Sequence, residues 1–327
     1  MVLHQPMSIE QRPLRSEEIA FNPLAPGHVR LRVRACGVCR TDLHIVEGEL
    51  PPRHPAIVPG HQIVGEVAES ADPLHTIGTR VGISWMGGVD GTCAYCLNGA
   101  ENLCDAPTFT GYDVDGGYAA YVDARGDFAS PLPSAMDDLQ AAPLLCAGII
   151  GFRALRVAGV RPNERVGLFG FGASAHLALP VLQHWECEAY VSTRGQSHRE
   201  FARTLGAAWV GDATEPPPHA LDRAITFAPS GDVVLSALSS LRKGGVLAIN
   251  AIHLDRMPEF DYDRLLWGER QIRSVTNMTR ADAHDFLGLA AAIRLQPAVQ
   301  TFSLQQANEA LAAVKRDAID GAAVLLP

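Results

Sequence analysis

Short apolar runs separated by turn residues characterise the first 135 or so residues of the chain. Runs such as HVRLRVRAC (28–36), QIVGEVAE (62–69) and RVGISW (80–85) are rich in β-branched residues and are bounded by glycine and proline. Their length and composition are typical of strands joined by turns. The pattern therefore predicts an antiparallel, barrel-like β domain in this part of the chain.

From about residue 138 the pattern changes, and strand-like runs alternate with helix-like stretches. DDLQAAPLLCAGIIGFRALRVAG (137–159) has helical spacing, and the helix is expected to begin near Asp137 and Asp138. Strands alternating with helices of about 10–15 residues predict a parallel sheet, and six strands match a doubly wound dinucleotide-binding fold. The expected strands are 165–171, 188–193, 207–212, 222–229, 245–250 and 272–277, and the expected helices between them include 174–185, 198–206 and 231–244.

The last 45 residues are expected to be helical and to end in the strand-like run AAVLL (322–326), which is expected to return to the first domain. This organisation gives two domains. Residues 148–282 would bind a dinucleotide, and residues 1–147, completed by residues 283–327, would form the other domain.

The charge balance and the cysteines narrow the class of function. Lys and Arg number 27 and Asp and Glu 36, so the net charge is −9, which argues against nucleic acid or an anionic membrane as partner. No apolar run reaches the roughly 18 residues of a membrane helix, and no secretion signal is visible in MVLHQPMSIEQRPL (1–14). Seven clustered cysteines suggest metal binding or catalysis in a cytoplasmic enzyme.

The stretch GLFGFGASA (167–175) follows the first strand of the parallel region and opens a helix. It gives the dinucleotide-binding pattern Gly170-x-Gly172-x-x-Ala175, with Ala173 and Ser174 at the start of the helix. The first glycine permits a tight turn, and the second lets the backbone approach a pyrophosphate. We therefore expect a nicotinamide dinucleotide here; the alternative is a glycine-rich turn without a ligand.

The next strand should end beside the adenosine ribose, where an acidic residue would favour NAD. Glu186 and Glu188 precede the apolar part of that strand and so lie at its wrong end. The end that faces the cofactor reads Ser192, Thr193 and Arg194. Small hydroxyls and an arginine suit a 2′-phosphate, so the sequence favours NADP, with NAD possible and a surface arginine as the alternative.

The segment DGTCAYCLNGAENLC (90–104) has the spacing of a structural zinc loop. Three cysteines follow C-x2-C-x7-C on a glycine-rich loop, and the fourth ligand should come three residues before the first cysteine. That position is an aspartate, whose carboxylate can ligate zinc; the alternative is an empty site. The expected structural set is Asp90, Cys93, Cys96 and Cys104.

The octapeptide GVCRTDLH (37–44) gathers a thiol, a hydroxyl, a carboxylate and an imidazole. Together with His61 and Cys146, Cys39 would make a Cys2His set, which leaves an open fourth position as a catalytic zinc requires. Each residue alone could instead be an ordinary core residue, because a buried cysteine is usually a small apolar side chain.

Five motifs in the same order resemble the zinc-dependent alcohol dehydrogenases of the medium-chain dehydrogenase/reductase superfamily, in the bacterial branch related to cinnamyl alcohol dehydrogenases. The likeness covers nearly the whole chain. It implies a GroES-like, partly open β-barrel catalytic domain and a doubly wound Rossmann domain, an α/β plus β architecture. The motifs are GVCRTDLH (37–44), GHQIVGEV (60–67), the cysteine loop (90–104), TGYDVDGGYAAYV (110–122) and GFGASAHLA (170–178).

The resemblance implies a role for each matching residue. Cys39, His61 and Cys146 would hold a catalytic zinc, beside the structural zinc of the cysteine loop. Zinc would lower the pKa of a bound alcohol so that an alkoxide gives up hydride to NAD(P). Thr41 would hydrogen-bond the substrate alcohol, and His44 would pass its proton on to solvent. The Asp42 carboxylate would orient the ligand His61, and Trp85 would form a bulky wall of the substrate pocket.

Two departures from the family accompany this likeness. Gln62 replaces the glutamate that usually follows the ligand histidine, and Asp90 replaces the first cysteine of the structural set. Two other functions remain as alternatives: a zinc-free quinone or enone reductase of the same superfamily, and an inactive NADP-binding protein. The expected partners are a small alcohol or aldehyde and further copies of the chain, as a homodimer or homotetramer.

Overall fold

The computed structural model describes residues 1–213, 215–251, 253–319 and 321–327. The chain forms two compact units. Unit 1 contains Met1–Cys146 together with Asn277–Pro327, and unit 2 contains Ala147–Thr276. Each unit has its own hydrophobic core.

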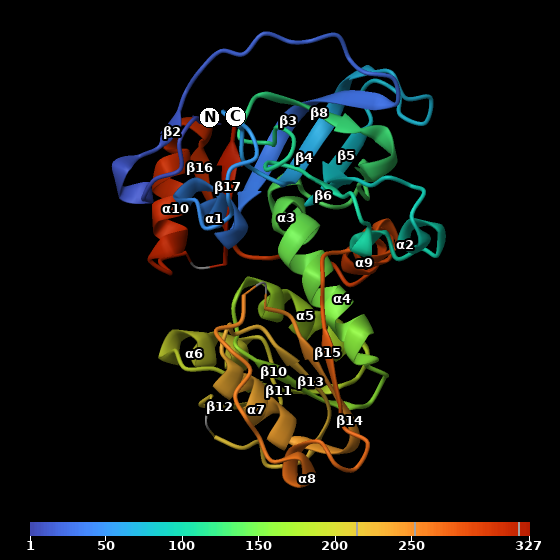
Figure 1. The fold of residues 1–327 in the computed structure, drawn as a ribbon, viewed down its shortest axis with the longest axis vertical. Helices are drawn as coiled ribbons and strands as arrows, with labels where there is room; N and C mark the ends of the chain where they lie inside the picture. Colours follow the sequence, from blue (N-terminus) through green and yellow to red (C-terminus); the bar gives the residue numbers. More distant parts are fainter. Residues whose placement is uncertain (214, 252, 320) are drawn as a thin grey trace. The chain divides into compact units, whose positions relative to one another are not determined.

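Unit 1 is built on a seven-stranded sheet with the order β16-β17-β3-β4-β5-β9, in which β8 also pairs with β3 (Figure 1). The pairs among β3, β4, β5, β8, β9 and β17 are antiparallel, which confirms the expected β domain. The strands are β3 (His28–Val38), β4 (Gln62–Ser70), β5 (Arg80–Ile83), β8 (Tyr121–Arg125), β9 (Ser130–Pro131), β16 (Val299–Ser303) and β17 (Ala322–Leu326).

Two small antiparallel sheets and several helices complete unit 1. The small sheets pair β1 (Val2–Leu3) with β2 (Leu14–Arg15), and β6 (Met86–Gly88) with β7 (Thr108–Phe109). The helices are α1 (Arg40–Glu47), α2 (Ala94–Leu97), α3 (Asp138–Pro143), α9 (Arg280–Ala292) and α10 (Ala307–Lys315), with 3-10 turns η1 (Ile9–Gln11), η2 (Glu101–Leu103), η3 (Gly126–Phe128) and η5 (Leu304–Gln306).

Buried apolar residues and exposed charged residues alternate along β3, a central strand of the sheet in unit 1. Leu31 and Val33 are buried in the core, while Arg32 and Arg34 between and after them are exposed. Both arginines lie within ion-pair distance of Glu66 on β4. Period-two alternation therefore fixes the register of β3, since a slip of one residue would bury its arginines.

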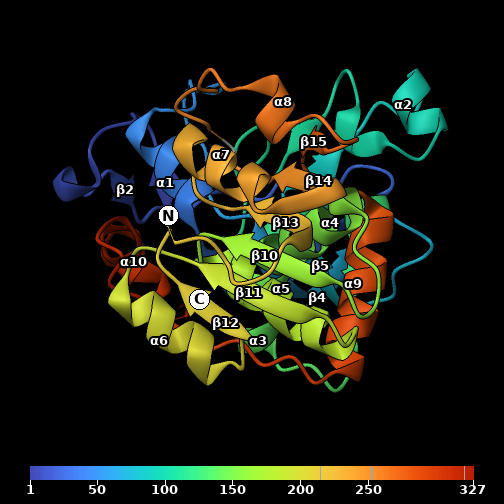
Figure 2. The same ribbon diagram turned by 90° about the horizontal axis from the view of Figure 1, so that it is seen from below.

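Unit 2 contains a six-stranded sheet in which every neighbouring pair is parallel. The order β12-β11-β10-β13-β14-β15 is that of a doubly wound dinucleotide-binding fold, as expected. Figure 2 shows α6 and α7 on opposite sides of this sheet. The elements are β10 (Arg165–Phe169), β11 (Glu188–Ser192), β12 (Trp209–Gly211), β13 (Leu221–Thr226), β14 (Leu241–Ile249), β15 (Gln271–Ser274), α4 (Ile149–Ala158), α5 (Ala173–His184), α6 (Gln196–Thr204), α7 (Gly231–Ser239) and α8 (Tyr262–Leu265).

Two regions differ from the expected secondary structure by more than a few residues. The helix expected over 231–244 ends at Ser239, and β14 begins at Leu241, which pairs with Leu221 of β13. The expected helical C-terminal segment also contains β16, which pairs in parallel with β17. In both cases pairing with a distant strand overrides the local pattern.

One continuous helical stretch, Asp138–Ala158, is long and apolar enough to cross a membrane by length and composition alone. It comprises α3, a π-helical segment η4 (Leu144–Gly148) and α4, and 72% of its most apolar window is buried inside the protein. Burial of this degree is typical of the core helix of a folded domain. The expected helix start is confirmed, because Asp137 caps α3 by accepting a hydrogen bond from the Leu139 N–H.

Candidate metal centres and nucleotide-binding turn

Three sequence-distant residues of unit 1 bring their donor atoms together. The Cys39 and Cys146 sulfurs and a His61 ring nitrogen all lie within 4.8 Å of one another. The Cys39 Sγ is 3.3 Å from the His61 Nε2. The structure thus assembles the Cys2His set that the sequence suggested, and its three donors are those of an open zinc site.

Local backbone structure aims each of these donors. Cys39 is the extended N-cap residue of α1, and Cys146 lies in η4 directly after Pro143, which lacks a backbone N–H for regular helical bonding. His61 follows Gly60, whose φ of +100° is rarely accessible to other residues. A Cβ at Gly60 would also lie 2.4 Å from the Tyr118 ring, so the turn before His61 requires glycine.

Asp42 contacts the ring nitrogen of His61 that faces away from Cys39. Its Oδ1 is 3.0 Å from the His61 Nδ1, and its Oδ2 accepts a 2.9 Å hydrogen bond from the Cys39 N–H. Both side chains are fully buried. Because the carboxylate contacts Nδ1, the other ring nitrogen, Nε2, is the one directed at the cysteines.

The pKa shifts show how the three donors share their protons. The Cys146 thiol and the His61 charge lower the pKa of Cys39 well below its usual value, against the effect of burial. The hydrogen bond with Cys39 and burial raise the pKa of Cys146. Burial alone would lower the pKa of His61, but the Asp42 and Cys39 charges raise it. The cluster therefore concentrates negative charge that would attract a dication, and a bound dication would displace the protons of the thiol and the imidazole.

Thr41 and His44 are the second and fifth residues of α1, the helix that Cys39 caps. The Thr41 side chain is buried, and the His44 Nδ1 is 2.5 Å from the Glu49 Oε2. Gly48 ends α1 in the left-handed conformation, and the Leu50 N–H donates to the His44 carbonyl, which turns Glu49 back toward the histidine. Glu49 was not predicted as a site residue, although the glycine after α1 signals a turn at this point.

Trp85 contacts the candidate centre through its indole ring. The ring lies edge-on to His61, with centroids 5.1 Å apart, and stacks on Phe109 at 4.8 Å. Tyr112 extends the stack at 6.1 Å from Trp85. Trp85 therefore belongs to an aromatic stack of three rings beside His61.

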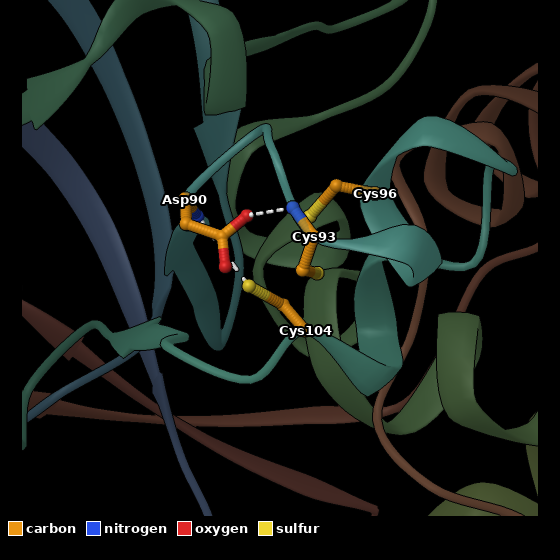
Figure 3. A group of neighbouring side chains, drawn as sticks. All are labelled: Asp90, Cys93, Cys96 and Cys104. Atoms are coloured by element: carbon orange, nitrogen blue, oxygen red, sulfur yellow. Dashed lines mark hydrogen bonds between the residues drawn. The ribbon is translucent and has the colours of Figure 1, made fainter.

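A second donor set occupies the loop around α2. One ligand atom from each of its four residues lies within 4.8 Å of the others, and Figure 3 shows the carboxylate and the sulfurs facing one another. One carboxylate oxygen of Asp90 accepts hydrogen bonds from the Thr92 and Cys93 N–H groups at 2.7 and 2.9 Å. The set is the one expected from the spacing: Asp90, Cys93, Cys96 and Cys104.

Electrostatics favour a cation in this loop. Backbone N–H groups, that of Cys93 first, hold the pKa of Asp90 well below its usual value. Backbone hydrogen bonds from Cys96 and Asp105 lower the pKa of Cys93, whereas desolvation and the neighbouring thiols raise the pKa of Cys96 to about 12. A dication would stabilise all four groups in their anionic forms.

The glycine turn of unit 2 joins β10 to α5. Gly170 has φ +90°, and its N–H donates to the Ser192 carbonyl at 2.8 Å. Gly172 is the N-cap residue of α5, and a Cβ there would meet no atom within 4 Å. The second glycine therefore leaves the approach to the helix N-terminus open, as an anion-binding turn requires.

The residues after β11 divide into buried hydroxyls and an exposed cation. Ser192 and Thr193 are buried, and Arg194 is exposed. Glu188 lies at the opposite end of β11 and pairs with Arg165 at 3.1 Å. The structure thus places the arginine, and not that glutamate, at the carboxyl end of the strand.

A family model for the alcohol dehydrogenase GroES-like domain matches residues 25–134. The chain is 45% identical over 331 residues to a probable alcohol dehydrogenase, AdhA, of Mycobacterium tuberculosis, covering 99% of this chain and 96% of that protein. The chain belongs to the alcohol dehydrogenase family. An alcohol dehydrogenase of Geobacillus stearothermophilus is 34% identical, with 96% of each chain covered.

The fold of this alcohol dehydrogenase is also found in a solved structure. A cobalt- and zinc-bound thermostable alcohol dehydrogenase from Pyrobaculum aerophilum matches with a TM-score of 0.88 at 22% identity, covering 100% of this chain and 98% of that one. The GroES-like domain and the Rossmann-type parallel sheet expected from the sequence are therefore confirmed.

The residues present fit zinc at both donor sets. Thiolate, imidazole and carboxylate are its usual ligands, with three protein ligands where chemistry occurs and four where the metal is structural. The set containing His61 has three donors, and the set containing Asp90 has four. His61 also has the carboxylate partner on its second nitrogen that ligand histidines normally have.

Proposed function

We propose that this protein is a zinc-dependent alcohol dehydrogenase and aldehyde reductase, which transfers hydride between a primary or secondary alcohol and a nicotinamide cofactor. The observation that carries this proposal is the convergence of Cys39, His61 and Cys146, with Asp42 behind the histidine. A zinc-free reductase would have no use for this set.

The three donors would hold the catalytic zinc, which supplies a Lewis acid for the alcohol or carbonyl oxygen. Cys39 and Cys146 contribute thiolates, and Asp42 keeps the His61 Nε2 directed at the metal position. The aromatic stack that begins with Trp85 would exclude water and present an apolar wall to the substrate.

Proton transfer would pass through Thr41 and His44. The Thr41 hydroxyl can both accept and donate a proton, and it lies one helical turn from the imidazole on the same helix. With the His44 Nδ1 on Glu49, its Nε2 is the nitrogen that exchanges the proton on the substrate side. This relay delivers the alcohol proton to solvent without a strong base at the reacting carbon.

The nucleotide would bind to unit 2 with its pyrophosphate at Gly170, Gly172 and the N-terminus of α5, at Ala173, Ser174 and Ala175. We propose that NADP(H) is preferred and NAD(H) accepted. Arg194 is the cation that supports this preference, at the end of β11 where a 2′-phosphate would lie. Ser192 and Thr193, which are buried at the same strand end, would contribute small hydroxyls to this part of the cofactor site.

The second donor set would hold a structural zinc, giving two per chain. Asp90 serves there as a ligand and, through its hydrogen bonds to the Thr92 and Cys93 N–H groups, as the group that shapes the loop. We further propose that the protein acts in the cytoplasm, where its seven free cysteines stay reduced, as a homodimer or homotetramer.

The experiment is the reduction of a panel of small aldehydes with NADPH and with NADH, before and after treatment with a chelator. Chelator-sensitive turnover that favours NADPH would support the metal assignment and the cofactor preference. Turnover that favours NADH would keep the reaction and reject Arg194 as a determinant. Zinc-loaded protein without turnover would indicate an inactive nucleotide-binding protein, and turnover insensitive to metal removal would favour a quinone or enone reductase.

A further inference from the structure

The ends of two neighbouring strands in unit 2 form one edge at which cofactor selectivity can be set. β11 ends at Ser192 and β12 at Gly211, which are paired in register. The Thr193 N–H donates to the Gly211 carbonyl at 3.1 Å. The residues that follow, including Arg194 and Asp212, therefore leave the sheet at its carboxyl edge, where doubly wound folds bind nucleotides.

Asp212 is an acidic residue at this edge, and Arg199 of α6 pairs with it. The Arg199 Nη1 donates to the Asp212 Oδ2 at 2.6 Å, and its Nη2 donates to the Gln196 Oε1 at 3.1 Å. The Arg199 side chain is 21% exposed, and that of Asp212 is 44% exposed. The guanidinium is therefore oriented by two partners while part of it stays open to solvent.

The pair has a direct electrostatic consequence for the cofactor. An isolated carboxylate beside the adenosine ribose would accept from a 2′-hydroxyl and repel a 2′-phosphate. Arg199 neutralises that carboxylate, and its five N–H donors can serve a carboxylate and a phosphate together. A guanidinium already held in place also loses less conformational entropy when a phosphate binds.

We propose that Arg199, held by Asp212, is a specificity-determining residue that binds the 2′-phosphate of NADP(H) together with Arg194. This inference rests on the cofactor preference in the proposed function. It adds a second cation, positioned from α6, to the one that follows β11.

Direct binding tests the proposal without requiring zinc or turnover. The probes are adenosine 2′,5′-bisphosphate and adenosine 5′-monophosphate, which differ only in the 2′-phosphate, titrated into the full chain in a calorimeter. Arg199→Ala should weaken the bisphosphate by about tenfold and leave the monophosphate unchanged, because one charge-assisted contact is lost. Arg203→Ala, which removes an exposed arginine of the same helix, should change neither affinity.

Asp212→Asn provides the opposite change at the same pair. It removes the negative charge but keeps an amide oxygen that can still accept from the Arg199 guanidinium, so Arg199 stays oriented. The bisphosphate should therefore bind severalfold more tightly and the monophosphate equally well. Equal weakening of both probes by Arg199→Ala, no effect on either, or a wild type that does not prefer the bisphosphate would overturn the proposal.

The outcome separates this inference from the proposed function. If the protein prefers the bisphosphate through Arg199 but reduces no aldehyde, the role of Arg199 is supported and the proposed enzymatic activity is rejected. If the protein reduces aldehydes with NADH and binds both probes equally well, the proposed enzymatic activity is supported and the role of Arg199 is rejected.

Discussion

At the scale of single residues, the candidate active site depends on side chains that have no packing reason to be where they are. Asp42 and His61 are charged or polar and fully buried, which is costly unless each has a partner. They partner one another, and Asp42 also accepts from the Cys39 N–H. A buried pair of this kind next to two thiols is the arrangement that a metal-binding histidine requires.

Thr41→Val tests the relay hydroxyl. The substitution keeps the volume of the side chain and removes its proton, so turnover should fall by about 10²-fold while zinc content and the unfolding temperature stay near those of the wild type. Steady-state kinetics and metal analysis check this. Thr41→Ser is the matched control, since it restores the hydroxyl, and an unimpaired valine variant would remove Thr41 from the relay.

Asp42→Asn tests the support behind His61. The amide keeps the shape but loses the charge that faces the Nδ1, so zinc affinity should fall by about 10- to 100-fold. Competition with a chromogenic chelator measures the change. Asp123→Asn, which removes a surface partner of Arg30 in the same unit, should leave zinc affinity intact. Unchanged affinity in Asp42→Asn would contradict the orienting role.

At the scale of elements, period and turn residues predicted most strands and helices, and tertiary pairing accounts for the misses. The 165–171, 188–193 and 222–229 runs are strands with nearly the expected bounds, because buried parallel strands are continuous apolar runs. Leu241 looked helical and is a strand residue because it pairs with Leu221. The set of Asp90 and the three loop cysteines was predicted from its spacing. Cys39, His61 and Cys146 lie far apart in the sequence, so their assignment depended on the resemblance to a family; the structure brings the donor atoms of both sets together. The contact of Glu49 with His44 follows a turn that Gly48 signals, although the glycine does not specify the side-chain pairing. The contact of Arg199 with Asp212 joins α6 to the end of β12, and no local pattern encodes it.

The parallel sheet contains a half-buried carboxylate, that of Asp222, whose protonation should affect stability. Asp222 on β13 accepts from the Arg165 N–H at 2.8 Å and from the Arg242 guanidinium on β14. Burial opposes the charge, but these donors lower the pKa of Asp222. A carboxyl whose folded pKa lies below its unfolded value stabilises the fold above the unfolded pKa and loses this effect as pH falls through the folded pKa.

Asp222→Asn should therefore lower the free energy of unfolding at neutral pH by about 1 kcal/mol, the order of one net hydrogen bond. The difference from the wild type should shrink below about pH 4, where the unfolded carboxyl becomes protonated. Urea denaturation at several pH values measures it. Glu259→Gln, at an exposed position of the same unit, should show no such trend. A difference independent of pH would show that the charge of Asp222 is not the cause.

At the scale of the whole molecule, the two units carry different parts of the chemistry. Both metal-ligand sets belong to unit 1, and the glycine turn with the Arg199–Asp212 pair belongs to unit 2. Because the protein has a net charge of −9, an anionic cofactor needs local positive charge at its binding site. Arg194 and Arg199 would supply that charge. The two metal-ligand sets of unit 1 share no residue, so damage to one set should have effects separable from damage to the other.

The most direct measurement is zinc content and NADPH-dependent aldehyde reduction, determined on the same samples of the wild type, Cys39→Ser and Cys93→Ser. The wild type should contain about two zinc ions per chain and turn over. Cys39→Ser should lose about one zinc and nearly all turnover, whereas Cys93→Ser should lose about one zinc and thermal stability but keep its activity per folded molecule. Full turnover in Cys39→Ser would contradict the assignment of Cys39, His61 and Cys146 as the catalytic metal centre.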